Sequence, residues 1–164
     1  MKNQSLLIKA VQKFNTIEEK KCRLLIIGDV RDQSLYQKLY ALVGDDKSIE
    51  FLRGKDNVAD YLNVADFFCL SSSHEGMPIS LIEALSVGCI SICTRVGGIK
   101  DMIENEINGF LSMDNSVDSY YQTIKRAVSY PDKERIKENS FNSFKRNYHI
   151  GTSVTKYFQA YSLG

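Results

Sequence analysis

Apolar and polar residues alternate in blocks along the chain, in a pattern that predicts strands and helices in turn. Short continuous apolar runs, each bounded by small or polar residues, occupy residues 22–29, 48–54, 66–72, 89–94 and 109–112. Such runs are typical of strands that are buried on both faces of a sheet. The pattern predicts an α/β fold, a Rossmann-like doubly wound parallel sheet with helices on both faces.

Between these runs, and ahead of the first, apolar residues recur at helical spacing. The first predicted helix lies in residues 1–14 and would bury Leu6, Leu7, Ala10, Val11 and Phe14. Further helices are expected at 33–44, ending at Gly44, at 58–65, after Pro78 and at 98–105. From residue 114 to the end the pattern predicts helices broken near Pro131 and Gly151. With 164 residues and no internal linker, the sequence predicts one domain over residues 1–164.

The charge balance excludes some classes of partner. Lysine and arginine number 21 and aspartate and glutamate 20, so no strong field attracts nucleic acid. No apolar run approaches the roughly 20 residues that span a bilayer. The four cysteines lie in or beside apolar runs without metal-type spacing, which indicates buried, reduced thiols of a cytoplasmic protein. No metal is expected.

The chemistry concentrates in residues 71–88, SSSHEGMPISLIEALSVG. Glu75 and Glu83 stand here with seven residues between them. Gly76 lets the backbone turn or approach a ligand closely, and Pro78 suits the first turn of a helix. The start of that helix would present free N–H groups and a positive dipole end to an anion. Two carboxylates beside an anion site are suited to accept hydroxyl groups on either side of a phosphate, as in a nucleotide diphosphate sugar.

This stretch resembles the retaining glycosyltransferases of the group 1 type (family 4), which have the two-domain GT-B fold. The motif residues are Glu75, Gly76, Pro78, Leu81, Glu83, Ala84 and Gly88. Other landmarks resemble the family in order, at residues 2–10, 24–29, 51–54, 64–72 and 94–111. The resemblance covers about residues 2–160. It implies that residues 1–164 are the nucleotide-sugar-binding domain, the C-terminal half of the GT-B fold.

The resemblance also implies a role for each matching residue. Glu83 would accept hydrogen bonds from the ribose, and Glu75, the expected catalytic residue, would contact the donor sugar. The diphosphate would lie on backbone N–H groups around Leu81 and Ile82, with Lys2 as the phosphate-binding lysine. The base would lie near Gly54 and Lys55. The full set of expected binding residues is Lys2, Gly54, Lys55, Glu75, Gly76, Met77, Pro78, Leu81, Ile82 and Glu83.

The chain also departs from the family. The family domain begins with a strand ending in Gly-Arg ahead of the lysine, and that first strand and its arginine are not found before Lys2. The N-terminal, acceptor-binding domain is not found either. Residues 22–28 and 66–72 are therefore expected either to pair directly or to leave a gap that another chain fills.

The function implied is transfer of a hexose from a UDP- or GDP-sugar to a saccharide or lipid-linked acceptor, with retained configuration. The expected setting is bacterial surface polysaccharide biosynthesis in the cytoplasm, at the inner face of the membrane, with the full-length enzyme associated peripherally. No cofactor besides the nucleotide-sugar donor is expected. This chain alone would be inactive, since it lacks the acceptor domain. Two alternatives remain open, a binding-only nucleotide-sugar module and half of a nucleotide-sugar epimerase.

Overall fold

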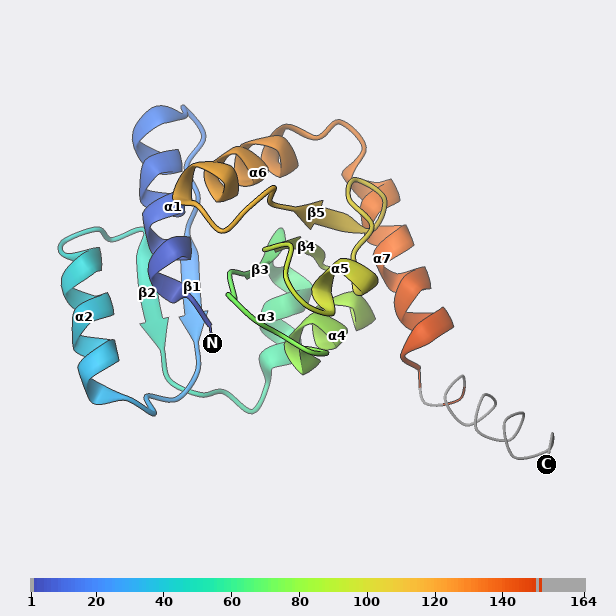
Figure 1. Ribbon diagram of the computed structural model, residues 1–164, viewed down its shortest axis with the longest axis horizontal. Helices are drawn as coiled ribbons and strands as arrows, with labels where there is room; N and C mark the ends of the chain where they lie inside the picture. Colours follow the sequence, from blue (N-terminus) through green and yellow to red (C-terminus); the bar gives the residue numbers. More distant parts are fainter. Residues whose placement is uncertain (1, 150, 152–164) are drawn as a thin grey trace.

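The computed structural model describes residues 2–149 and 151. In this part of the chain, five short strands alternate with seven helices (Figure 1). The strands are β1 Leu24–Ile27, β2 Ile49–Leu52, β3 Phe67–Leu70, β4 Ile90–Cys93 and β5 Gly109–Leu111. The helices are α1 Gln4–Ile17, α2 Gln33–Val43, α3 Val58–Val64, α4 Ile79–Ser86, α5 Ile99–Met102, α6 Val117–Ser129 and α7 Lys133–Asn147. The predicted alternation of strands and helices is confirmed.

The helix ends follow local signals in the sequence. Asn3 caps α1 by accepting a hydrogen bond from the Leu6 amide at 3.2 Å, and Asp32 caps α2 in the same way. Gly44 ends α2 with a φ of 58°, which favours glycine. The predicted break near Pro131 separates α6 from α7, whereas the helix expected beyond Gly151 lies outside the described residues. No helix among the described residues is long and apolar enough to cross a membrane.

The strands form two parallel sheets rather than one. In the first, β1 pairs with β2, and in the second the order is β3-β4-β5. β1 and β3 do not pair with each other. Of the two outcomes expected for residues 22–28 and 66–72, the structure therefore shows the gap. The gap is a cavity of about 450 Å³ lined by β1, β3 and side chains of α1, α3 and α4, which we term the inter-sheet slot.

The two strands that border the slot run in the same direction. At the end of α1, the Asn15 side chain exchanges hydrogen bonds with the backbone of Cys22, just ahead of β1. At the start of α1, the Ser71 hydroxyl donates to the Asn3 carbonyl at 2.8 Å, just beyond β3. The carboxyl end of β3 thus lies at the start of α1, and β1 begins at the opposite end. Both strands therefore end at the same edge.

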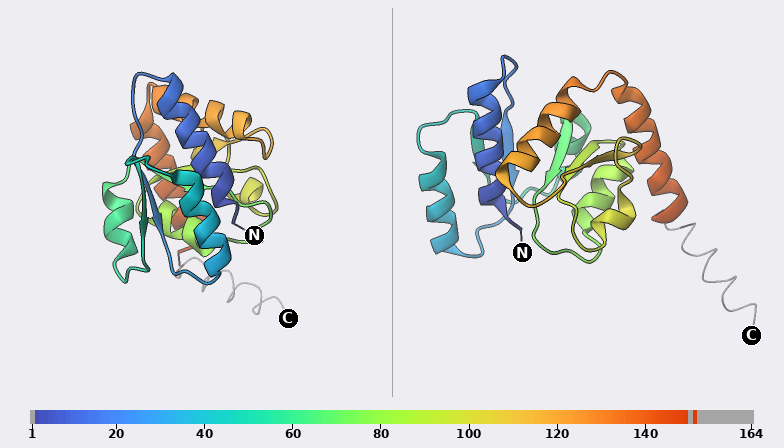
Figure 2. Two further views of the ribbon diagram at one scale, coloured as in Figure 1. Left: turned by 90° about the vertical axis from the view of Figure 1, so that its left-hand side faces the viewer. Right: turned by 45° about the horizontal axis from the view of Figure 1, so that its top comes forward.

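Helices α1 and α6 join the two sheets across the slot, and Figures 1 and 2 show them side by side. The rings of Phe14 and Tyr121 meet edge to face, with centroids 6.4 Å apart. The Glu18 carboxylate accepts from the Tyr121 hydroxyl at 2.6 Å and pairs with Lys125 at 2.8 Å. Behind these contacts one apolar core runs from Leu24 and Ile49 to Ile92 and Phe110. Side-chain packing therefore connects the sheets where backbone pairing does not.

Candidate functional site

The Glu75 loop lies at the carboxyl edge of the three-stranded sheet, as predicted. It leaves β3 after Leu70 and enters α4 at Ile79. The neighbouring strand holds its first residues, because the Thr94 amide donates to the Leu70 carbonyl at 2.9 Å. The Thr94 hydroxyl donates to the Ser72 carbonyl at 2.5 Å, and Thr94 is fully buried. The start of the loop is thus fixed by the end of β4.

Glu75 is half-buried, and hydrogen bonds hold both its side chain and its backbone carbonyl. The Ser72 hydroxyl donates to Glu75 Oε1 at 2.7 Å. The Glu75 carbonyl accepts from the Gly98 amide at 3.1 Å. One carboxylate oxygen therefore has a donor inside the protein, and Gly76 and Met77 beyond it are exposed. The carboxylate is held at the sheet edge where a ligand of a parallel sheet would lie.

Gly97 and Gly98 pack backbone to backbone against this loop. A Cβ on Gly97 would lie 1.9 Å from the Glu75 carbonyl oxygen, and Gly97 has a φ of 47°. A Cβ on Gly98 would lie 1.9 Å from the Gly76 carbonyl oxygen, although the φ of Gly98 is an ordinary −72°. A side chain at position 97 or 98 would collide with a backbone carbonyl of the Glu75 loop. Because both residues are glycine, the loop can pack directly against the backbone at the start of α5.

Helix α4 begins at Ile79, directly after the Glu75 loop. Pro78 is its N-cap and makes no side-chain capping bond. The amides of Leu81 and Ile82 both donate to the Pro78 carbonyl, at 3.1 and 3.3 Å. These two groups, which the resemblance assigned to a diphosphate, are therefore engaged within the helix. The amides of Ile79 and Ser80 precede them and are the ones that a helix start leaves without an intrahelical acceptor.

The structure brings Lys2, Ser80 and Glu83 to one cavity, since all three line the inter-sheet slot. Glu83 is exposed on the second turn of α4, about 6 Å along the helix from Ile79. Lys2 is exposed at the start of α1. Glu75, by contrast, is not among the residues that line this cavity.

Gly54 and Lys55 lie apart from this cluster, beyond the end of β2. The Gly54 amide donates to Asp29 Oδ1 at 3.2 Å, and a Cβ on Gly54 would lie 2.6 Å from that oxygen. Asp29 therefore links the ends of β1 and β2, and its side chain would have to move to admit a larger residue at position 54. From the sequence, Asp29 is expected only to end a strand, because its hydrogen-bond partner lies 25 residues away.

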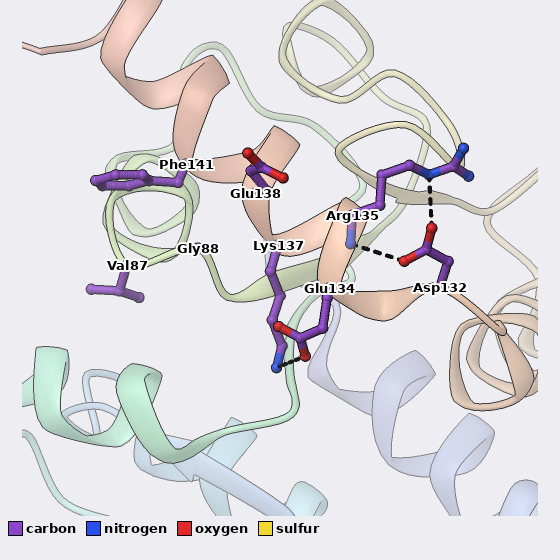
Figure 3. A pocket seen from close by; sticks show the side chains of 8 residues that line it. All are labelled: Val87, Gly88, Asp132, Glu134, Arg135, Lys137, Glu138 and Phe141. Atoms are coloured by element: carbon purple, nitrogen blue, oxygen red, sulfur yellow. Dashed lines mark hydrogen bonds and ion pairs between the residues drawn. The ribbon is translucent and has the colours of Figure 1, made fainter.

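A second hollow, about 660 Å³ and shallow, lies between α4 and α7 (Figure 3). Its lining is Val87, Gly88, Asp132, Glu134, Arg135, Lys137, Glu138 and Phe141. The charged groups pair with one another, Lys137 with Glu134 at 2.9 Å and Arg135 with Asp132 at 3.6 Å. Residues of the 71–80 loop take no part in it, so it is not the predicted site.

Cys89 and Cys93 are buried, as expected, whereas Cys22 and Cys69 are only half-buried. Burial raises the pKa of Cys69 to about 12 and that of Cys89 to about 11, and it also raises the pKa of Cys93. At neutral pH these groups are protonated and poor nucleophiles. Among the described residues no cluster of three or more His, Cys, Asp or Glu side chains is arranged to hold a metal ion.

The chain is similar in sequence to parts of several longer glycosyltransferases and related enzymes. The chain is 28% identical over 154 residues to N-acetyl-alpha-D-glucosaminyl L-malate synthase of Bacillus anthracis, covering 90% of this chain and 40% of that protein. It is 28% identical over 110 residues to an Escherichia coli galactosyltransferase, UDP-Gal:alpha-D-GlcNAc-diphosphoundecaprenol alpha-1,3-galactosyltransferase, covering 67% of this chain and 28% of the relative. The chain thus spans less than half the length of these relatives.

Solved structures show the same fold. Anabaena HepE in complex with UDP superposes with a TM-score of 0.88 at 18% identity, over 99% of this chain and 46% of that one. The C-terminal domain of a group 1 glycosyl transferase from Francisella tularensis superposes with a TM-score of 0.78 at 22% identity, over 91% of this chain and 80% of that one. The family model for glycosyl transferases group 1 matches residues 1–143. The chain therefore belongs to the glycosyl transferases group 1 family and has the fold of its C-terminal, GT-B domain.

Proposed function

We propose that this chain binds the nucleotide-sugar donor of a retaining glycosyltransferase, with UDP or GDP as the nucleotide. The observation that carries the proposal is the start of α4, where the Ile79 and Ser80 amides lack intrahelical acceptors. Along the chain, Glu75 precedes this helix start and Glu83 lies on the second turn of the helix. The diphosphate accepts hydrogen bonds from the amides of Ile79 and Ser80. The family resemblance alone indicated Leu81 and Ile82, the next two residues along the helix. A helix N-terminus attracts a diphosphate through its N–H groups and its dipole.

The surrounding residues then take distinct roles. Glu83 accepts hydrogen bonds from the ribose hydroxyls, and Glu75 contacts the donor sugar. Lys2 adds positive charge near the phosphates from the start of α1. Gly54 and Lys55, at the end of β2, border the space for the base. The solved Anabaena neighbour that was crystallised with UDP-glucose supports a nucleotide-sugar ligand for this fold.

In the transfer reaction this domain stabilises the leaving diphosphate. Negative charge builds on the diphosphate as the glycosidic bond to the sugar breaks, and the α4 dipole and Lys2 stabilise that charge. A hexose then passes to a saccharide or lipid-linked acceptor held by a companion domain. The chain alone transfers no sugar, because an acceptor held in place accounts for up to roughly 7–11 kcal/mol of a barrier.

Calorimetric titration of the chain with UDP and with GDP tests the proposal. Glu83→Ala is expected to weaken binding of the preferred nucleotide by about 1–3 kcal/mol, since it removes a charged hydrogen-bond acceptor. Glu138→Ala removes an exposed glutamate of α7 and serves as the matched control, with no change expected. Equal affinity of the Glu83→Ala variant and the parent chain would show that the ribose role is wrong.

A further inference from the structure

The turn that follows β4 carries an arginine at the carboxyl edge of the three-stranded sheet. The Val96 amide donates to the Thr94 carbonyl at 3.0 Å, so Arg95 is the central residue of a three-residue turn. Arg95 is exposed, whereas Thr94 before it is fully buried. Parallel sheets bind their ligands beyond the carboxyl ends of the strands. Arg95 therefore lies at the edge of the sheet where a ligand is expected.

Contacts on both sides of Arg95 attach this turn to the Glu75 loop. On one side, the Thr94 hydroxyl donates to the Ser72 carbonyl at 2.5 Å. On the other side, the Gly98 amide donates to the Glu75 carbonyl at 3.1 Å. Both acceptors are backbone groups of the loop, and neither contact involves the Arg95 side chain. The position of the turn beside Glu75 is thus fixed, and the Arg95 guanidinium is not used to fix it.

Arg95 has no acidic partner in the described part of the chain. Three other arginines each pair with a carboxylate: Arg23 with Glu50, Arg126 with Glu106 and Arg135 with Asp132. Arg95 forms no ion pair within residues 2–149 and 151. Its guanidinium is always charged in a protein and can bind a carboxylate through two parallel hydrogen bonds. Arg95 is therefore available to an oxyanion of a ligand.

The chemistry of the proposed donor indicates which oxyanion this is. The diphosphate is assigned to the start of α4, and the donor sugar is assigned to Glu75. A neutral hexose brings no negative charge to the Glu75 loop, so it would leave the Arg95 guanidinium without a counter-charge. A hexuronate, in which C6 is a carboxylate, brings a second negative charge beside Glu75, and the repulsion between the two is offset by a cation next to them.

We propose that Arg95 is a specificity-determining residue that binds the C6 carboxylate of a hexuronate, so that the donor is a nucleoside diphosphate hexuronate rather than a neutral nucleotide sugar. The inference rests on the proposed function, because that function places the donor sugar beside Glu75. A phosphate on the acceptor is a second oxyanion source in the reaction. It fits Arg95 less well, because the acceptor is held by a companion domain and Arg95 is attached to the loop of the donor sugar.

Calorimetric titration of the chain with matched donors tests the proposal. The probes are UDP-glucuronate, UDP-glucose and UDP, or GDP-mannuronate, GDP-mannose and GDP if the chain prefers guanine. The parent chain is expected to bind the hexuronate donor about tenfold more tightly than the neutral donor, the scale of a hydrogen bond between charged groups. Arg95→Gln is expected to abolish this preference and to bind the free nucleotide as the parent chain does.

Two further variants sharpen the test. Arg95→Lys keeps the charge without the two-pronged geometry, so part of the preference should remain. Arg146→Gln removes an exposed arginine of α7 and is the matched control, with the full preference expected. Because Arg95 is exposed, its variants should melt at the same temperature as the parent chain.

The possible results separate this inference from the proposed function. Equal binding of the two donors by the parent chain, or an unchanged preference in Arg95→Gln, would overturn the inference and leave the proposed function standing. Weaker binding of the free nucleotide by Arg95→Gln would show that Arg95 contacts the diphosphate, which would also overturn it. Failure of the parent chain to bind either UDP or GDP would overturn the proposed function, and this inference with it.

Discussion

The two sheets of this domain differ in strand pairing and in burial. In the sheet β3-β4-β5, the central strand β4 is paired on both sides, and all four of its residues are buried. In the sheet β1-β2, β1 is paired on one side and has one buried residue of four. The Glu75 loop and α4 belong to the complete sheet, which fixes them through Thr94 and the Gly97–Gly98 pair. The Glu75 loop is thus fixed by the three-stranded sheet, whereas Lys2, Ser80 and Glu83 line the slot between the two sheets.

The largest expected effect comes from separating the two halves. Phe14→Ala removes the α1 ring that packs on Tyr121 of α6 and is 1% exposed. The loss of a buried phenylalanine is expected to lower the free energy of unfolding by about 3–5 kcal/mol. Because side-chain packing connects the sheets, amides of β1 and β2 should lose exchange protection before those of β4. Denaturant unfolding and hydrogen exchange measure the two effects.

Phe141→Ala is the control for that experiment. Phe141 lies on α7 and is 37% exposed, so its removal should cost less and should leave the relative protection of the two sheets unchanged. Equal loss of protection in both sheets of Phe14→Ala would argue against packing across α1 and α6 as the connection.

A smaller effect is expected at the glycine pair. Gly98→Ala keeps an allowed backbone conformation but places a methyl group against the Gly76 carbonyl, so the Glu75 loop must move. We expect a stability loss of about 1–3 kcal/mol, the scale of overpacking, and weaker UDP binding. Gly76→Ala is the matched control for stability, because its Cβ would meet no atom within 4 Å. Unchanged stability and binding in Gly98→Ala would show that the close packing is not required.

The smallest effect concerns alkaline pH. Burial raises the pKa of Cys69 from 9.0 to about 12, so the folded state keeps the proton that the unfolded chain releases above pH 9. This contribution is complete below pH 9 and is lost as the pH rises toward 12. Between pH 7 and 10 it removes about 1.4 kcal/mol from the free energy of unfolding. Cys69→Ala should show a correspondingly shallower decline, and an identical decline would mean that the thiol titrates normally in the fold.

Much of the fold was predictable from the sequence because its signals are local. Apolar runs located all five strands, and Gly44 and Pro131 marked helix boundaries. The partners that fix the site were not predictable, because they are distant in sequence: Thr94 lies 22 residues from Ser72. The run at 22–29 was expected to be buried on both faces, which is wrong for Leu25. Its sequence is suited to a central strand, but among the described strands β1 pairs only with β2, and its other edge borders the slot.

The start of α4 is proposed to hold the diphosphate of the donor, with Glu83 on the ribose and Glu75 on the sugar. A crystal structure of the chain with millimolar UDP tests it most directly. We expect diphosphate oxygens within hydrogen-bond distance of the Ile79 and Ser80 amides, with ribose hydroxyls on the Glu83 carboxylate. A diphosphate bound elsewhere on the chain, or a ribose directed away from Glu83, would contradict it.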